Sequence, residues 1–135
     1  METRVIENPR VAEELELLQK HFDDVECREA DGSCWFRVEP LHAPANCEPE
    51  QIAVVFSVTT GHPGPPPYGF YVPSNLTRDG APIETKPPPA APPFGGDWRF
   101  VSHQPEQWCP AANVTEGDNL WGWVRSIRER IGVGG

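Results

Sequence analysis

Six side chains suited to acyl-transfer chemistry lie close together near the C-terminal end of the chain. Residues 102–113 contain Ser102, His103, Gln104, Trp108, Cys109 and Asn113. A cysteine thiolate forms a thioester, which keeps an acyl group activated, whereas a serine forms a less activated oxyester and needs a general base within hydrogen-bond reach. This stretch therefore predicts a candidate site for the transfer of an acyl group.

The choice of nucleophile stays open between Cys109 and Ser102. Cys109 lies between a tryptophan and a proline, and a free cysteine in such a place can also be packed and inert. His103 follows Ser102, but neighbouring side chains on an extended strand point to opposite faces. The two residues can therefore act together only if the chain turns at Gln104-Pro105-Glu106. His62 is the alternative base, and a structural role for Ser102 and His103 at a strand end is the competing interpretation.

The other candidate residues are expected to support the site and not to act as the nucleophile. Gln104 or Asn113 can donate to an oxyanion, or can brace the loop through hydrogen bonds. Trp108 is expected to fill space under the loop. Asp118 is expected to cap the following helix, with the orientation of an acceptor amine as the weaker alternative.

Composition narrows the class of protein. The 135 residues suit one domain spanning 1–135, and the net charge of −9 argues against nucleic-acid binding, which requires clustered cations. The cysteines at 27, 34, 47 and 109 fit no zinc-binding spacing, so no metal site is expected and the first three are taken as structural. No apolar run reaches membrane-spanning length, and the first ten residues have no signal-peptide core. These features predict a cytoplasmic protein with reduced thiols.

The sequence predicts an amphipathic helix near each end of the chain. The first is expected to begin with Asn8 as cap and Pro9 in its first turn, and the second to begin after Thr115 or Asp118. Each has apolar residues at i, i+4, i+7 and i+11, which places them on one helical face. These residues are Val11, Leu15, Leu18 and Phe22 in the first helix, and Leu120, Val124, Ile127 and Ile131 in the second.

Between the helices the pattern predicts an antiparallel meander. Residues 25–30 and 34–39 are predicted to form a hairpin with Asp31-Gly32 at its turn. The prolines from Pro40 indicate a loop, and residues 52–58 are predicted to form a central strand. Residues 63–93 contain eleven prolines, interrupted by the β-forming residues 68–72, and should wrap over the domain, with 75–94 mobile. The last strand is expected at 98–101. The predicted fold is α+β, with an N-terminal helix, a four-stranded antiparallel meander, a proline-rich loop and a C-terminal helix.

This order of elements resembles the ubiquitin-conjugating (UBC/RWD) superfamily, in which a tyrosine- and proline-rich segment follows the third strand, as residues 64–71 (GPPPYGFY) do here. A bacterial group of UBC-like proteins has a Trp…Ser…His…Trp-x-Pro…Asp-(Asp/Asn)-Leu pattern. The chain matches it with Trp98, Ser102, His103, Trp108-Cys109-Pro110 and Asp118-Asn119-Leu120. It departs from the wider superfamily, which has His-Pro-Asn where this chain has His103-Gln104-Pro105.

The resemblance implies a carrier that accepts a ubiquitin-like protein from an activating adenylyltransferase and passes it to an amine. The setting it implies is a bacterial conjugation operon and anti-phage defence. Such a carrier needs no cofactor of its own, because the activating partner consumes the ATP, and it uses neither nucleic acid nor membrane. The alternative is a non-catalytic module that binds the ubiquitin-like protein or its activating enzyme. A serine hydrolase ranks behind both, because no nucleophile elbow is evident.

Overall fold

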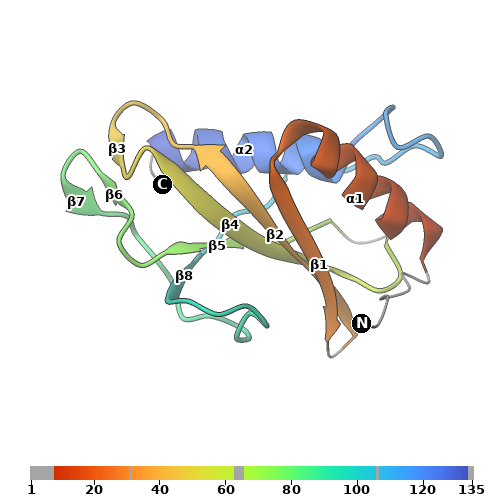
Figure 1. Ribbon diagram of the computed structural model, residues 1–135, viewed down its shortest axis with the longest axis horizontal. Coiled ribbons are helices and arrows are strands. Elements are labelled where there is room, and N and C mark those ends of the chain that lie inside the picture. The colour runs from red at the N-terminus through yellow and green to blue at the C-terminus, as the bar shows by residue number, and fades with distance from the viewer. Residues whose placement is uncertain (1–7, 31, 63–65, 106, 134–135) are drawn as a thin grey trace.

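An antiparallel sheet of five strands carries two helices on one of its faces (Figure 1). The computed structural model describes residues 8–30, 32–62, 66–105 and 107–133. The strand order is β1-β2-β4-β5-β8. The bounds of these strands are β1 Asp24–Ala30, β2 Ser33–His42, β4 Gln51–Thr59, β5 Phe70–Pro73 and β8 Trp98–Val101, and the helices are α1 Pro9–His21 and α2 Leu120–Val133.

The predicted α+β class and the antiparallel meander are confirmed, but the predicted number of strands in the sheet is wrong. The sheet has five strands and not four, because β5 pairs on one side with β4 and on the other with β8. A second, small sheet has the order β3-β6-β7 and is built from β3 Cys47–Glu48, β6 Thr77–Arg78 and β7 Ala81–Pro82. β6 and β7 lie within the 75–94 segment that was expected to be mobile.

The hairpin and the central strand are where the sequence placed them, with one correction. β2 does not end at Pro40 but continues to His42, because an irregularity between Val38 and Leu41 lets the chain pass the proline and resume pairing with β4. Three of the expected features involve residues outside the described ones. They are Asp31 of the hairpin turn, Glu106 of the turn after Pro105, and the first prolines at 63–65.

The first helix begins as expected, because the Asn8 side chain accepts hydrogen bonds from the backbone N–H groups of Arg10 and Val11. Its buried face differs from the predicted one. Val11 and Leu18 are buried, but Leu15 and Phe22 are only half-buried, while Leu17 and Glu14 are buried as well. The buried face of α1 is therefore shifted from the predicted one, and it includes the carboxylate of Glu14.

The second helix buries the whole predicted stripe of Leu120, Val124, Ile127 and Ile131. Its cap is a correction to the sequence prediction. The side chain of Asn119, and not that of Thr115 or Asp118, accepts a hydrogen bond from the backbone N–H of Gly122 at 2.8 Å.

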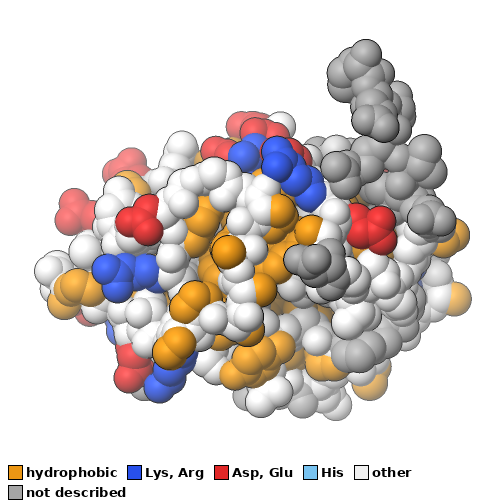
Figure 2. Space-filling view, turned by 90° about the horizontal axis from the view of Figure 1, so that it is seen from below, with side chains coloured by type: hydrophobic (Ala, Val, Ile, Leu, Met, Phe, Trp, Pro, Cys, Tyr) orange, Lys and Arg blue, Asp and Glu red, His pale blue; other side chains and the backbone are white. Residues whose placement is uncertain are grey.

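Part of the proline-rich segment lies against the other face of the sheet. Phe94 packs there in a second hydrophobic cluster with Trp35, Val55, Tyr71 and Phe100. The Tyr71 hydroxyl donates to the carbonyl of Ala90 at 2.6 Å, which fastens the segment to β5. Figure 2 views the molecule from the side opposite the helices, and hydrophobic side chains gather across the middle of that surface. In the described part of the chain no helix is both long and apolar enough to cross a membrane.

Candidate functional site

The candidate site is the loop that joins β8 to α2, residues 102–119, which projects past the N-terminal end of α2 (Figure 1). Helix α1 anchors the base of this loop. The guanidinium of Arg10, which is 7% exposed, donates to the carbonyl oxygen of Ala111 and, at 3.3 Å, to that of Asp118. The loop is therefore tied to the domain at two points that lie far from Arg10 in the sequence.

The buried carboxylate of Glu14 holds the Arg10 side chain in place. Glu14 is 0% exposed and accepts hydrogen bonds from Arg10 Nε at 3.3 Å and from the backbone N–H of Leu120 at 2.9 Å. Its Oε2 atom is also 2.9 Å from Nε2 of His62. Since Nδ1 of His62 has no partner in the described structure, the tautomer with its proton on Nε2 fits these contacts. His62 is thereby engaged with Glu14, and within the described structure no hydrogen bond joins its ring to Ser102 or Cys109.

Ser102 and His103 point to different neighbours, as adjacent residues on an extended backbone should. The Oγ atom of Ser102 lies 2.6 Å from the hydroxyl of Tyr68, whose side chain is 55% exposed. The His103 ring instead stacks on Trp123 with centroids 5.2 Å apart, and meets Phe70 edge-on. Within the described residues no hydrogen bond joins Ser102 to His103, so the structure does not pair them as nucleophile and base.

The surroundings of His103 disfavour its protonated form. Burial lowers the pKa of the imidazole below its usual range, and the nearby positive charge of Arg130 lowers it further. Nε2 of His103 is buried and has no hydrogen-bond partner among the described residues. The ring is thus a neutral, packed component of the interface between the loop and α2.

Cys109 lies in the exposed part of the loop and is held through its backbone by Asp118. Its N–H donates to Oδ2 of Asp118 at 2.6 Å, and its carbonyl accepts from the N–H of Asp118 at 3.1 Å. Asp118 was expected to cap α2. Its side chain instead joins Asp118 to Cys109, the two residues that form the neck of the loop, and Asn119 caps the helix. The Cys109 side chain is left free to face solvent.

The tip of the loop depends on one glycine and one asparagine. Gly117 has a φ of +68°, and a Cβ atom on it would lie 2.7 Å from the carbonyl oxygen of Cys109. The side-chain oxygen of Asn113 accepts from the N–H and the hydroxyl of Thr115 at 2.9 and 2.8 Å. The Asn113 oxygen is therefore engaged in a local turn, which matches the bracing role that the sequence offered as one of two alternatives.

The exposure of the thiols separates Cys109 from the buried cysteines. Cys34 and Cys47 are 6% and 4% exposed, and burial raises the pKa of both thiols, which disfavours the reactive thiolate. Cys27 is half-buried on β1, and Cys109 is exposed. Of the four cysteines, Cys109 is therefore the most accessible from outside the protein.

The two other predicted site residues, Gln104 and Trp108, differ in their burial. Gln104 is exposed, and the described part of the chain offers its amide no hydrogen-bond partner. Trp108 is half-buried against the main core, with its ring 6.1 Å from that of His62, as its predicted packing role requires. Together with Asp118, Asn119 and Trp123, it lines a cavity of about 190 Å³ between the loop and α2.

The anchor formed by Arg10 and Glu14, and the contact of Tyr68 with Ser102, were not predicted. A signal for the anchor was present, because Glu14 lies three residues after Val11 and four before Leu18, on the face that the apolar stripe predicts to be buried. Tyr68 carried no comparable signal, because it lies 34 residues before Ser102 in a segment rich in proline.

The described residues contain no cluster of three or more His, Cys, Asp or Glu side chains that would hold a metal ion. Comparison of the chain with protein-family models, with curated proteins and with solved structures finds no match.

Proposed function

We propose that this protein is a UBC-like carrier that accepts a ubiquitin-like protein from an activating adenylyltransferase and transfers it to an amine. The observation that carries the proposal is the presentation of Cys109, an exposed thiol on a loop whose neck is closed by Asp118. A thiol presented in this way can meet the active site of a second protein, because its backbone is fixed while its side chain stays accessible.

The proposed reaction consists of two exchanges at one carbonyl carbon. In the first, Cys109 Sγ attacks the thioester between the ubiquitin-like protein and the activating enzyme. A new C–S bond forms, the old one breaks, and the departing thiol of the activating enzyme takes up the proton that Cys109 loses. In the second, an amine attacks, the C–N bond forms, the C–S bond to Cys109 breaks, and the departing sulfur takes up the proton that the amine loses. Both steps proceed without a cofactor on this chain.

Ser102 is the alternative acceptor and would carry the ubiquitin-like protein as an oxyester. Ser102 is half-buried and its hydroxyl is hydrogen-bonded to Tyr68, and among the described residues neither His103 nor His62 forms a hydrogen bond with it. A serine nucleophile requires a base within hydrogen-bond reach. The geometry therefore favours Cys109 as the acceptor.

The second candidate function is a non-catalytic module that binds a ubiquitin-like protein or its activating enzyme. The observation in its favour is that, among the described residues, neither His62 nor His103 forms a hydrogen bond with Ser102 or Cys109, so neither is in place to act as their base. Such a module would also be similar to the UBC/RWD superfamily, but it would form only a non-covalent complex with its partner.

The experiment is intact mass spectrometry after incubation with the activating enzyme, the ubiquitin-like protein and ATP. Cys109→Ala and Ser102→Ala are compared with the parent, and Cys27→Ala and Ser33→Ala serve as matched controls that remove a thiol or a hydroxyl elsewhere. Formation of the thioester on the activating enzyme proves that the partners are active.

We expect an adduct that is cleaved by a thiol reductant and is lost only in Cys109→Ala. An adduct that resists the reductant and is lost only in Ser102→Ala would identify the oxyester carrier. No adduct with active partners, together with a measurable complex, would refute the carrier and support the binding module.

A further inference from the structure

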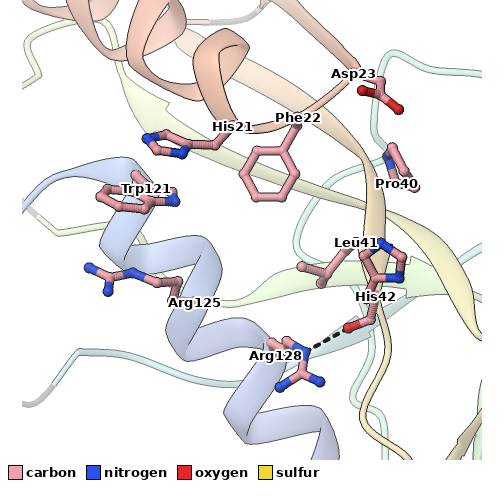
Figure 3. Close-up of a pocket in the computed structure, with 9 residues that line it drawn as sticks. All are labelled: His21, Phe22, Asp23, Pro40, Leu41, His42, Trp121, Arg125 and Arg128. Atoms are coloured by element: carbon pink, nitrogen blue, oxygen red, sulfur yellow. Dashed lines mark hydrogen bonds between the residues drawn. The ribbon is translucent and has the colours of Figure 1, made fainter.

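A second cavity lies away from the Cys109 loop, where the C-terminal end of α1 meets β2 and α2 (Figure 3). Its volume is about 400 Å³. The floor is apolar and consists of Phe22, Pro40 and Leu41, while α2 contributes an aromatic and cationic wall. The lining residues are His21, Phe22, Asp23, Pro40, Leu41, His42, Trp121, Arg125 and Arg128.

The wall of this cavity is a continuous stack of rings and a guanidinium. The imidazole of His21 lies parallel to the Trp121 indole, with centroids 3.9 Å apart and an interplanar angle of 5°. The Arg125 guanidinium carbon lies 4.4 Å from the centroid of the Trp121 ring. Stacking fixes the orientation of these planar groups, so the wall is already ordered before any ligand arrives.

The positive charges at this wall have no internal counter-ions. Among the described residues, neither Arg125 nor Arg128 forms an ion pair with a carboxylate. Arg128 uses Nε to donate to the carbonyl of His42 at 2.7 Å, which holds the guanidinium in place (Figure 3). Its two terminal nitrogens have no hydrogen-bond partner within the described part of the chain. Of the residues that line the cavity, only Asp23 is acidic, and in Figure 3 it lies at the end away from Arg125.

These features lead us to infer that the cavity is a docking site for an acidic peptide segment of a partner protein. An apolar side chain of the segment fits against Phe22 and Leu41, while carboxylates on either side of it pair with Arg125 and Arg128. Guanidinium–carboxylate pairs are the strong, geometrically specific form of hydrogen bond. Arg125 and Arg128 place two positive charges without an ion pair beside one cavity of a chain whose net charge is −9, and this local charge favours an acidic partner at that cavity. This site is separate from the proposed acceptor Cys109.

The test uses a fluorescein-labelled five-residue peptide with a central phenylalanine and four glutamates, blocked at both ends. Fluorescence anisotropy is measured with the parent, with Arg125→Gln and with Arg128→Gln. Arg99→Gln is the matched control, because Arg99 is exposed on β8 and does not line the cavity. We expect saturable binding below about 1 mM, weakened about tenfold or more by either α2 substitution and changed less than about twofold in the control.

Two further readouts keep the inference testable if a variant folds poorly. The parent peptide should shift the NMR signal of the Trp121 indole N–H, and a peptide with glutamines in place of its glutamates should bind about tenfold or more weakly. The inference is overturned by the absence of saturable binding, by equal binding of the glutamine peptide, or by binding that neither arginine substitution weakens. A single-stranded oligonucleotide that displaces the peptide equally well would overturn it in favour of general polyanion binding. Concentration-dependent dimers that Arg125→Gln abolishes would assign the cavity to a second copy of the chain.

Discussion

Replacement of Glu14 by alanine should destabilise the protein far more than a surface substitution on the same helix. Glu14 is fully buried and accepts hydrogen bonds from Arg10, His62 and the first N–H of α2. Its loss leaves a buried guanidinium without its counter-ion and a helix terminus without its acceptor. Truncation of one partner in a buried charged pair lowers the free energy of unfolding by about 3–5 kcal/mol. We expect Glu14→Ala to fall in this range.

Urea unfolding followed by tryptophan fluorescence measures the effect, since the chain has five tryptophans. With a denaturant dependence of about 2 kcal/mol per molar urea, a loss of about 4 kcal/mol moves the unfolding midpoint down by roughly 2 M. The matched control is Glu13→Ala, because Glu13 is the adjacent residue and is exposed. Its effect should stay within about 0.5 kcal/mol.

Glu14→Gln tests the charge separately from the shape. The amide oxygen can still accept from the Leu120 N–H, but the negative charge beside Arg10 is gone, so the loss of stability should lie between those of the two alanine variants. If Glu14→Ala lowers the midpoint no further than Glu13→Ala does, the buried anchor contributes nothing measurable and the reasoning above is refuted.

Three other predictions concern the loop and its supports. Maleimide should label Cys109 in the native protein at least about tenfold faster than Cys47, because burial both shields the Cys47 thiol and raises its pKa; equal rates contradict this. NMR titration should give His103 a pKa below about 6.5, the ordinary value expected in the unfolded chain. As the pH falls below about 6.5, the unfolded chain therefore binds a proton at this residue before the native protein does. The free energy of unfolding should then decrease with falling pH, by at most about 1.4 kcal/mol per pH unit from this residue, and a pKa at or above about 6.5 would contradict the prediction. Gly117→Ala should lower stability by about 1–3 kcal/mol and exceed Gly80→Ala, because both positions have positive φ but only the Cβ at 117 would meet the Cys109 carbonyl; equal losses would show that the contact does not matter.

The local elements of the fold were predictable because they depend on short-range patterns. The Asn8 cap and the α2 stripe from Leu120 to Ile131 are where the sequence placed them. β4 is central in the sheet, as its apolar run indicated. The segment 68–72 was recognised as β-forming but was not counted as a strand of the sheet, because the short strand β5 depends on its pairing with β4 and β8.

The candidate site was only partly predictable. The sequence located the loop and its chemically competent side chains, but it could not orient them. The contacts of Ser102 with Tyr68 and of His103 with Trp123 are 34 and 20 residues apart in the chain. The role of Asp118 changed for the same reason, since its partner Cys109 lies across the neck of the loop.

The sequence by itself determined the α+β class, the approximate positions of both helices and of β1, β4 and β8, and the stretch in which side chains suited to acyl-transfer chemistry are concentrated. These follow from periodicity, capping and turn residues, which act over a few positions of the chain. The tertiary structure alone decided which thiol faces solvent, which histidines are engaged in packing, and that Glu14 and Arg10 hold the loop. Those outcomes depend on contacts between α1, β8 and α2, because burial and hydrogen bonding between distant segments are set only when the sheet and both helices have packed together.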